Sequence, residues 1–291
     1  MSAAGGRVAS PKSGPLTQGT IFSCATAEDY ENCNVHGLII TARCDIAQSK
    51  AQIYNYLPVV QLDDWIHRDG RIILCERLIK STLGKIKAVL RAAGYSESVM
   101  QTETPAAILE TLFPETEEKQ KAKVREQFRT LLENLEQLNA CEESPPLDGR
   151  IVQIADRYSS ERDTLIKELA AQKLNGYYFL ETVTSENKPT GYIVLLREVR
   201  HIPRELAYWI ANGLSKSEYE AAYAQNKELF GRLSFCEEEV SMPMGLLQSP
   251  DIEHLMQVFS FLFSRIGLPD LDPKYVNEIW ERQPSVERGR K

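Results

Sequence analysis

The apolar positions near the start of the chain fall in extended runs rather than at helical spacing. Residues 38–41 (Leu-Ile-Ile-Thr) form a continuous apolar run, which is typical of a strand buried on both faces. Residues 54–62 form a second run, in which Pro58 predicts an edge strand or a bulge because proline has no N–H for the ladder. Residues 71–75 fit either a strand or the entry to a helix. Shorter runs predict further strands at 20–24, 151–155, 177–181, 191–196, 199–202 and 233–240.

Helical spacing takes over between residues 76 and 139. A first helix follows from apolar residues three and four apart and ends near Gly94, and a short second helix covers 105–112. A third helix begins near Pro114, where acids occupy the first turn. Its apolar residues alternate in steps of four and three, and we call them the seam: Val124, Phe128, Leu131, Leu135 and Leu138. Two interpretations stay open for the seam: packing within its own domain, or pairing with a partner helix or a second copy.

Further helix signals lie in the second half of the chain. Residues 159–174 carry leucines along one side, and residues 203–213 begin with proline and end with glycine. Ser217 to Glu220 has the form of a capping box, which predicts a helix running to about residue 230. The last helix is expected to start at Ser249 and to end at Gly267, with an aromatic-rich face in the core.

These elements predict a mixed α+β protein. We expect a partly closed, SH3-like β-barrel with a helical insertion and a C-terminal packing helix. The two parts of the barrel flank the insertion, so they should fold as one unit. The expected organisation is a disordered N-terminus at 1–15, the first part of the barrel at 16–75, the helical insertion at 76–145, and the second part of the barrel with C-terminal helices at 146–291.

Composition and charge narrow the function classes. The net charge of −7 argues against non-specific nucleic-acid binding over the whole surface, although it is compatible with a local basic groove. The chain has no run of about 18 apolar residues and no signal-peptide core, so we expect no membrane association. Six cysteines without a CxxC pair indicate free thiols in a reducing, cytoplasmic setting.

No motif points to a cofactor, and we expect none. The sequence has no Gly-rich phosphate loop, no GxSxG elbow and no HExxH pair. The spacing of Cys24, Cys33, His36 and Cys44 is compatible with a zinc site. Structural zinc ligands usually come two to four residues apart, and only Cys33 and His36 do so. We therefore expect no metal site.

A charged triplet, Arg43-Cys44-Asp45, directly follows the first buried run. Charges at the edge of a core must be paired or hydrogen-bonded. On an extended chain Arg43 and Asp45 share a face and can pair, or Asp45 can cap the turn that follows. A neighbouring cation lowers the pKa of a thiol and makes it reactive. With Thr41 and Lys50, the triplet is a candidate ligand or catalytic site; the alternative is a salt-bridged structural corner.

A second candidate is the most basic segment of this acidic chain, formed by Arg197, Arg200, His201 and Arg204. Tyrosines flank this segment in the sequence. Arginine forks suit phosphate, and aromatic rings stack on bases, so a phosphate group or a nucleic-acid strand could bind here. The alternative is a solvated strand-to-helix corner that pairs with the abundant glutamates.

Two ends of the chain carry distinctive motifs. Residues 18–22 read Gln-Gly-Thr-Ile-Phe, and the apolar run of residues 37–41 leads to Cys44-Asp45-Ile46. The late segment has Ser249-Pro250, Glu253, Gln257, Phe259 and a Phe263 to Pro269 stretch. These motifs resemble a group of poorly characterised bacterial proteins with a QG-D-I strand followed by a strand that ends in Ser/Thr-x-x-Cys-Asp-Ile/Leu. The first strands also resemble the SH3-like barrel of MazF/PemK-type toxins, which have an acid where Thr20 stands here.

We therefore expect a binding or adaptor module, with a regulatory role, of the prokaryotic cytoplasm. Its expected partner is a protein, bound through the seam, in an antiviral defence or stress system. The alternative is a nuclease-like or toxin-like effector enzyme that uses the Arg43-Cys44-Asp45 triplet together with the basic segment.

Overall fold

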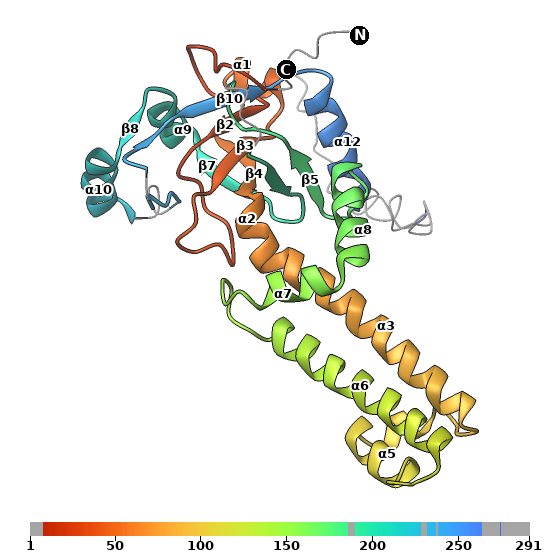
Figure 1. The fold of residues 1–291 in the computed structure, drawn as a ribbon. Coiled ribbons are helices and arrows are strands. Elements are labelled where there is room, and N and C mark those ends of the chain that lie inside the picture. Colours follow the sequence, from red (N-terminus) through yellow and green to blue (C-terminus); the bar gives the residue numbers. More distant parts are fainter. Residues whose placement is uncertain (1–7, 186–189, 228–231, 237, 264–273, 275–291) are drawn as a thin grey trace, which may run out of the picture.

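The computed structural model describes residues 8–185, 190–227, 232–236, 238–263 and 274. Its centre is an antiparallel sheet that curls into a half barrel, with helices packed around it (Figure 1). The strands of this sheet follow the order β1-β10-β2-β3-β4-β6-β5, and β7 also pairs with β4. The expected α+β class is confirmed. The strands of the main sheet are β1 (Val8–Ala9), β2 (Thr20–Phe22), β3 (His36–Ile39), β4 (Ile53–Gln61), β5 (Tyr177–Leu180), β6 (Tyr192–Leu195), β7 (Arg200–Pro203) and β10 (Pro243–Leu247).

Strand β4 lies in the interior of the sheet. Strand β3 pairs with it on one side. On the other side, β7 pairs with the first four residues of β4 and β6 pairs with its last three, so the partner changes at Leu57 and Pro58. The expectation that Pro58 marks an edge strand is therefore wrong. A residue without an N–H fits here because the ladder on one side is interrupted at this point.

The short strands β2 and β3 are buried on both faces, as the continuous apolar run predicts. Ile21 and Leu38 belong to the hydrophobic cluster on one face of the sheet, whereas Phe22 and Ile39 belong to the cluster on the other face. The alternation follows from the two-residue period of a strand. A continuous apolar sequence is required because each face is covered, one of them by the helix α12 (Asp251–Phe263).

The helices come in four groups along the chain. A short helix follows β3, and a chain of helical turns follows β4, including one π-helical turn, η1. Among the described residues, two further helices come after β7, and the last helix comes after β10. They are α1 (Arg43–Ala47), α2 (Leu62–Trp65), η1 (Ile66–Gly70), α3 (Arg71–Ala92), α4 (Val99–Thr102), α5 (Pro105–Leu112), α6 (Lys119–Glu142), α7 (Arg150–Arg157), α8 (Ser159–Ala170), α9 (Arg204–Ala211), α10 (Lys216–Gln225) and α12.

The predicted helical insertion is a hairpin of α3 and α6 that projects from the sheet, with α5 at its outer end (Figure 1). We call residues 71–142 the arm. Its outer part has a hydrophobic cluster of its own, separate from the two clusters of the sheet. Phe128 and Leu138 of the seam are 0% exposed, and the seam packs within the arm and at its base. The seam is therefore occupied inside this chain, and a partner bound through it, as the sequence predicted, has no free face there.

A buried arginine closes the base of the arm. Arg71, 6% exposed, donates from Nη1 to the carbonyl oxygen of Cys141 at 3.0 Å and to Oγ of Ser144 at 2.8 Å, and also to the Ser144 carbonyl oxygen. These acceptors lie at the C-terminal end of α6, where a cation is favourable for the helix dipole. The contact ties the first residue of α3 to the chain that leaves α6.

Several element predictions need correction. Residues 151–155 form helix α7 rather than a strand, because Ile151 and Ile154 are buried three residues apart. Within residues 233–240, strand pairing begins only at Val240, in the small sheet of β8 (Leu214–Ser215) and β9 (Val240–Ser241). Helix α6 begins at Lys119 instead of near residue 114, because Glu118 is its N-cap.

The structure also refines the predictions for the N-terminal segment, for the cap of α10 and for the last helix. Of the segment 1–15, expected to be disordered, residues 1–7 lie outside the described residues, and residues 8 and 9 form β1, which pairs with β10. The capping box of α10 uses Ser215 and Glu218 instead of Ser217 and Glu220. The expected end of the last helix at Gly267 lies outside the described residues. Within the described part of the chain, every helix is either too short or too polar to cross a bilayer.

Candidate functional site

The first predicted site is an exposed surface. Arg43, Cys44 and Asp45 lie on α1, whose N-cap is Ala42, so the extended arrangement that would pair Arg43 with Asp45 does not exist. Cys44 is exposed, and its Sγ lies 3.7 Å from Oδ1 of Asp45. Lys50 is exposed. Thr41 has a structural contact, because its Oγ1 accepts a 2.7 Å hydrogen bond from the backbone N–H of Asn55 on β4.

Helix α1 nevertheless lies beside both the N-terminal and the C-terminal motif segments. Arg43 pairs with Glu253 of α12 at 3.9 Å, with both side chains about half exposed. A hydrogen bond from Ser249 lowers the pKa of Glu253, ahead of the effect of Arg43. Arg43 and Gln18 also line a cavity of about 480 Å³ together with Lys12, Thr17, Leu246, Leu247, Gln248 and Ser249. The N-terminal, α1 and C-terminal motif segments thus meet at one place.

The second predicted site divides into parts that point to different neighbours. Arg204 begins α9 and donates from Nη1 to the carbonyl oxygen of Ser49 at 3.1 Å, so it fixes the loop after α1. Arg197 packs over Gly176, where an added Cβ would lie 2.7 Å from the arginine Nε. Arg200 and His201 line a shared cavity. The four basic residues are therefore close in the sequence, but their side chains have different neighbours in the fold.

The cavity at Arg200 and His201 has a volume of about 460 Å³, and we call it the Arg200 pocket. The register of β4 and β7 sets Arg200 opposite Tyr56 and His201 opposite Asn55. The chain segments before β3, before β7 and before β9 supply the rest of the lining. Its residues are Thr26, Glu28, Tyr56, Glu198, Val199, Arg200, His201 and Arg232.

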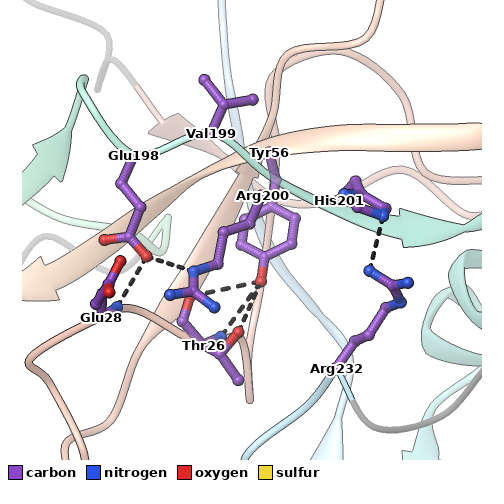
Figure 2. A pocket seen from close by; sticks show the side chains of 8 residues that line it. All are labelled: Thr26, Glu28, Tyr56, Glu198, Val199, Arg200, His201 and Arg232. Carbon is purple, nitrogen blue, oxygen red and sulfur yellow. Dashed lines mark hydrogen bonds and ion pairs between the residues drawn. The ribbon is translucent and has the colours of Figure 1, made fainter. Parts of the chain in front are cut away.

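One side of the Arg200 pocket is a hydrogen-bonded group (Figure 2). Oε1 of Glu198 accepts from Nε of Arg200 and, at 2.8 Å, from the backbone N–H of Glu28. The hydroxyl of Tyr56 lies 3.1 Å from Oγ1 of Thr26. Burial raises the pKa of Tyr56, and the hydrogen bonds with Thr26 oppose that shift without cancelling it. The hydroxyl therefore keeps its proton at neutral pH and donates a hydrogen bond to the carbonyl oxygen of Thr26 at 3.4 Å.

The other side of the pocket is an arginine–histidine pair, which Figure 2 shows across the cavity from Glu198. Nη1 of Arg232 lies 2.7 Å from Nε2 of His201. A guanidinium has no acceptor, so Arg232 donates and Nε2 accepts, which requires a neutral imidazole. Burial and then the charge of Arg232 lower the pKa of His201. Nε of Arg232 is buried and has no hydrogen-bond partner among the described residues.

Sequence reasoning missed four polar residues of the pocket: Thr26, Glu28, Glu198 and Arg232. Arg232 lies 31 positions from His201, and no local pattern joins them. Tyr56 was within reach of a sequence argument, because pairing the runs 54–62 and 199–202 sets it beside Arg200.

The structure places the four candidate zinc ligands in different environments. Cys24, Cys33 and His36 are buried, whereas Cys44 lies on the exposed face of α1. In residues 8–185 and the other described segments, no group of three or more His, Cys, Asp or Glu side chains is arranged to hold a metal ion.

Comparisons of the chain with family models, with curated proteins and with solved structures found no match.

Proposed function

We propose that this protein is a binding module whose Arg200 pocket takes a compact anion. The observation that supports this proposal most directly is the state of Arg232. Its guanidinium faces the pocket, its one hydrogen bond goes to a neutral histidine, and its Nε is buried without a partner within the described residues. A buried donor without a partner is costly, and an anion would relieve that cost.

Arg200 adds a second donor group on the opposite side. It binds Glu198 through Nε, and its terminal nitrogens make no hydrogen bond with any residue that the structure describes. Glu198 pairs with Arg200, whereas Arg232 has no ion pair among the described residues, and Glu28 sits exposed at the rim. Two guanidinium groups make a donor set that suits a phosphate or carboxylate group.

The size and the lining of the pocket favour a small ligand over a nucleic-acid strand. A volume of about 460 Å³ is within the range of small-molecule sites. Single-strand binding depends on aromatic faces that bases can stack on. Tyr56 is only 1% exposed, so its ring offers no face for stacking.

Calorimetric titration tests the proposal. The probes are inorganic phosphate, a nucleoside monophosphate and a dicarboxylate, which separate phosphate recognition from general anion binding. We expect Arg232→Met and Arg200→Met each to weaken binding by about tenfold or more, because a hydrogen bond to a charged group contributes about 1.5–3 kcal/mol. Arg129→Met, on the exposed face of α6, is the matched control. The proposal is wrong if all probes fail to bind the wild-type protein, or if the pocket variants bind like the control.

The nuclease-like or toxin-like alternative has less support. Cys44 and its charged neighbours lie on an exposed helix, away from the Arg200 pocket lining, and Nε2 of His201 already accepts a hydrogen bond. A general base needs a free lone pair within reach of the proton it takes. This alternative would be favoured if the wild-type protein has a nuclease or toxic activity and the folded variants Arg43→Ala and Asp45→Ala lose it.

We also propose that the curled sheet is a partly closed SH3-like barrel, a reading supported by its consecutive antiparallel neighbours β2, β3 and β4. Six free thiols support the proposal of a reducing, cytoplasmic location. A defence or stress setting remains our prediction, which phage-challenge assays of a deletion strain would test.

A further inference from the structure

A basic stripe on the arm is the strongest feature that the Arg200 pocket does not use. Residues 77–96 hold five Lys or Arg residues and no Asp or Glu, although the whole chain has a net charge of −7. Lys80, Lys87 and Arg91 are exposed on α3. At about 100° per residue, these three cations and Gly84 fall within a narrow arc of the helix. We call them the α3 stripe.

The cations of the α3 stripe are largely free of internal partners. Arg91 pairs with Glu97 at 3.1 Å near the outer end of the arm. Lys80 and Lys87 make no ion pair with any residue that the structure describes. With about 1.5 Å of rise per residue, they stand about 10 Å apart along the helix. A ligand with repeated negative charge would match this spacing.

The stripe borders an open groove between α3 and α6. The groove has a volume of about 480 Å³, and Ile79 and Leu83, both half-buried, supply apolar surface in it. Gly84 lies between them and Lys87, and a Cβ built there meets nothing within 4 Å. A glycine in a helix interior costs about 1 kcal/mol relative to alanine in helix propensity. Its effect here is to leave room for close approach to the α3 backbone.

We propose that the α3 stripe and this groove dock an acidic amphipathic helix of a partner protein. The apolar side of such a helix would cover Ile79 and Leu83, and its acids would reach Lys80 and Lys87. Helix-in-groove recognition combines these two contacts. A nucleic acid would use the cations but would leave the apolar surface uncovered, and the acidic remainder of the chain would repel it. Glu76 and Glu142 line the inner end of the groove, so they limit the acid-binding part to its outer half.

The probe for this proposal is a fluorescent synthetic peptide with leucines at helical spacing and glutamates flanking them. A scrambled peptide of the same composition keeps the charge and removes the apolar face. A short DNA duplex and anionic vesicles are the competing ligands. Fluorescence anisotropy at low ionic strength should show the patterned peptide binding at least about tenfold tighter than the scrambled one.

Substitutions on α3 distinguish the effect of its charge on peptide binding from the effect of the groove shape. Lys87→Glu should weaken binding of the patterned peptide by about tenfold, whereas Lys85→Glu, with the same charge change on another side of α3, should have a small effect. Gly84→Met fills the groove without changing charge, has room in the fold, and should also weaken binding. Circular dichroism checks that each variant is folded. Absence of peptide binding, equal binding of both peptides, equal loss in Lys85→Glu, or tighter binding of the duplex or the vesicles would each overturn the proposal.

Discussion

Replacing Phe128 with alanine would measure how far the arm is stabilised by its own core. The ring is 0% exposed, and its centroid lies 4.9 Å from that of Phe113. It packs in a cluster formed entirely by residues of the arm, with Ile86, Val89, Leu90, Ile108, Leu109, Phe113, Leu132 and Leu135. Removing a buried phenylalanine from such a site costs about 3–5 kcal/mol, because the transfer free energy of the ring and the cavity left behind add together.

Urea denaturation with two probes tests this magnitude. Circular dichroism reports helix content and so is sensitive to the arm, whereas all three tryptophans lie outside residues 71–142 and report on the rest of the chain. In Phe128→Ala we expect the helix signal to decrease at lower urea than the fluorescence signal, because the arm loses its core while the sheet keeps both of its clusters.

The neighbouring residue provides the control for this experiment. Arg129 is on the same turn of α6, is 55% exposed, and pairs with Glu126 at 2.6 Å. Arg129→Ala should change the free energy of unfolding by less than about 1 kcal/mol, as is usual for an exposed ion pair. If Phe128→Ala costs no more than Arg129→Ala, the reasoning about a separate arm core is refuted.

Three further predictions concern single side chains. Ser215→Ala should reduce thermal stability by about 1 kcal/mol through loss of the α10 capping box, whereas Ser217→Ala should leave it nearly unchanged; the reverse order would contradict the observed cap. Burial lowers the pKa of His36, with a smaller opposing effect of Glu238, so the folded state resists a proton that the unfolded state accepts. Stability should therefore fall as the pH drops below about 6.5, and His36→Gln should make that fall shallower in urea titrations at several pH values; equal slopes would argue against it. Cys44 is the exposed cysteine, so iodoacetamide should label it first in peptide mass spectra, and Cys44→Ser should remove the fast phase.

Local sequence patterns predicted a helix or a strand correctly where the pattern is compatible with only one kind of secondary structure. The short helix 105–112 has the predicted bounds, because Pro105 fits its first turn and Thr104 caps it. The strands predicted at 177–181 and 191–196 both form, and they are antiparallel neighbours in the sheet. A five-residue apolar run such as 151–155 fits both a strand and a buried helix turn, and only the tertiary packing of α7 decides between them.

The candidate site was less predictable because its parts come from distant segments. Arg200 and His201 were identified from charge alone, but the partner of His201 is Arg232, 31 positions away, and only the fold brings the two together. The charged triplet at residues 43–45 was expected to form an extended polar site. It lies on an exposed helix instead, because the chain turns at Ala42 and only Ile46 of α1 enters the core.

The contact between Arg71 and Ser144 has a consequence for how the arm can vary. It holds the two ends of the arm together, so helices α3 and α6 can gain or lose matched turns without moving any strand. The entropic cost of closing the arm changes only slowly with the number of residues in it. Each residue deleted from both helices would bring the outer end about 1.5 Å nearer to the sheet. Arm length therefore sets how far α5 stands from the sheet, and evolution or engineering can adjust it independently of the strands.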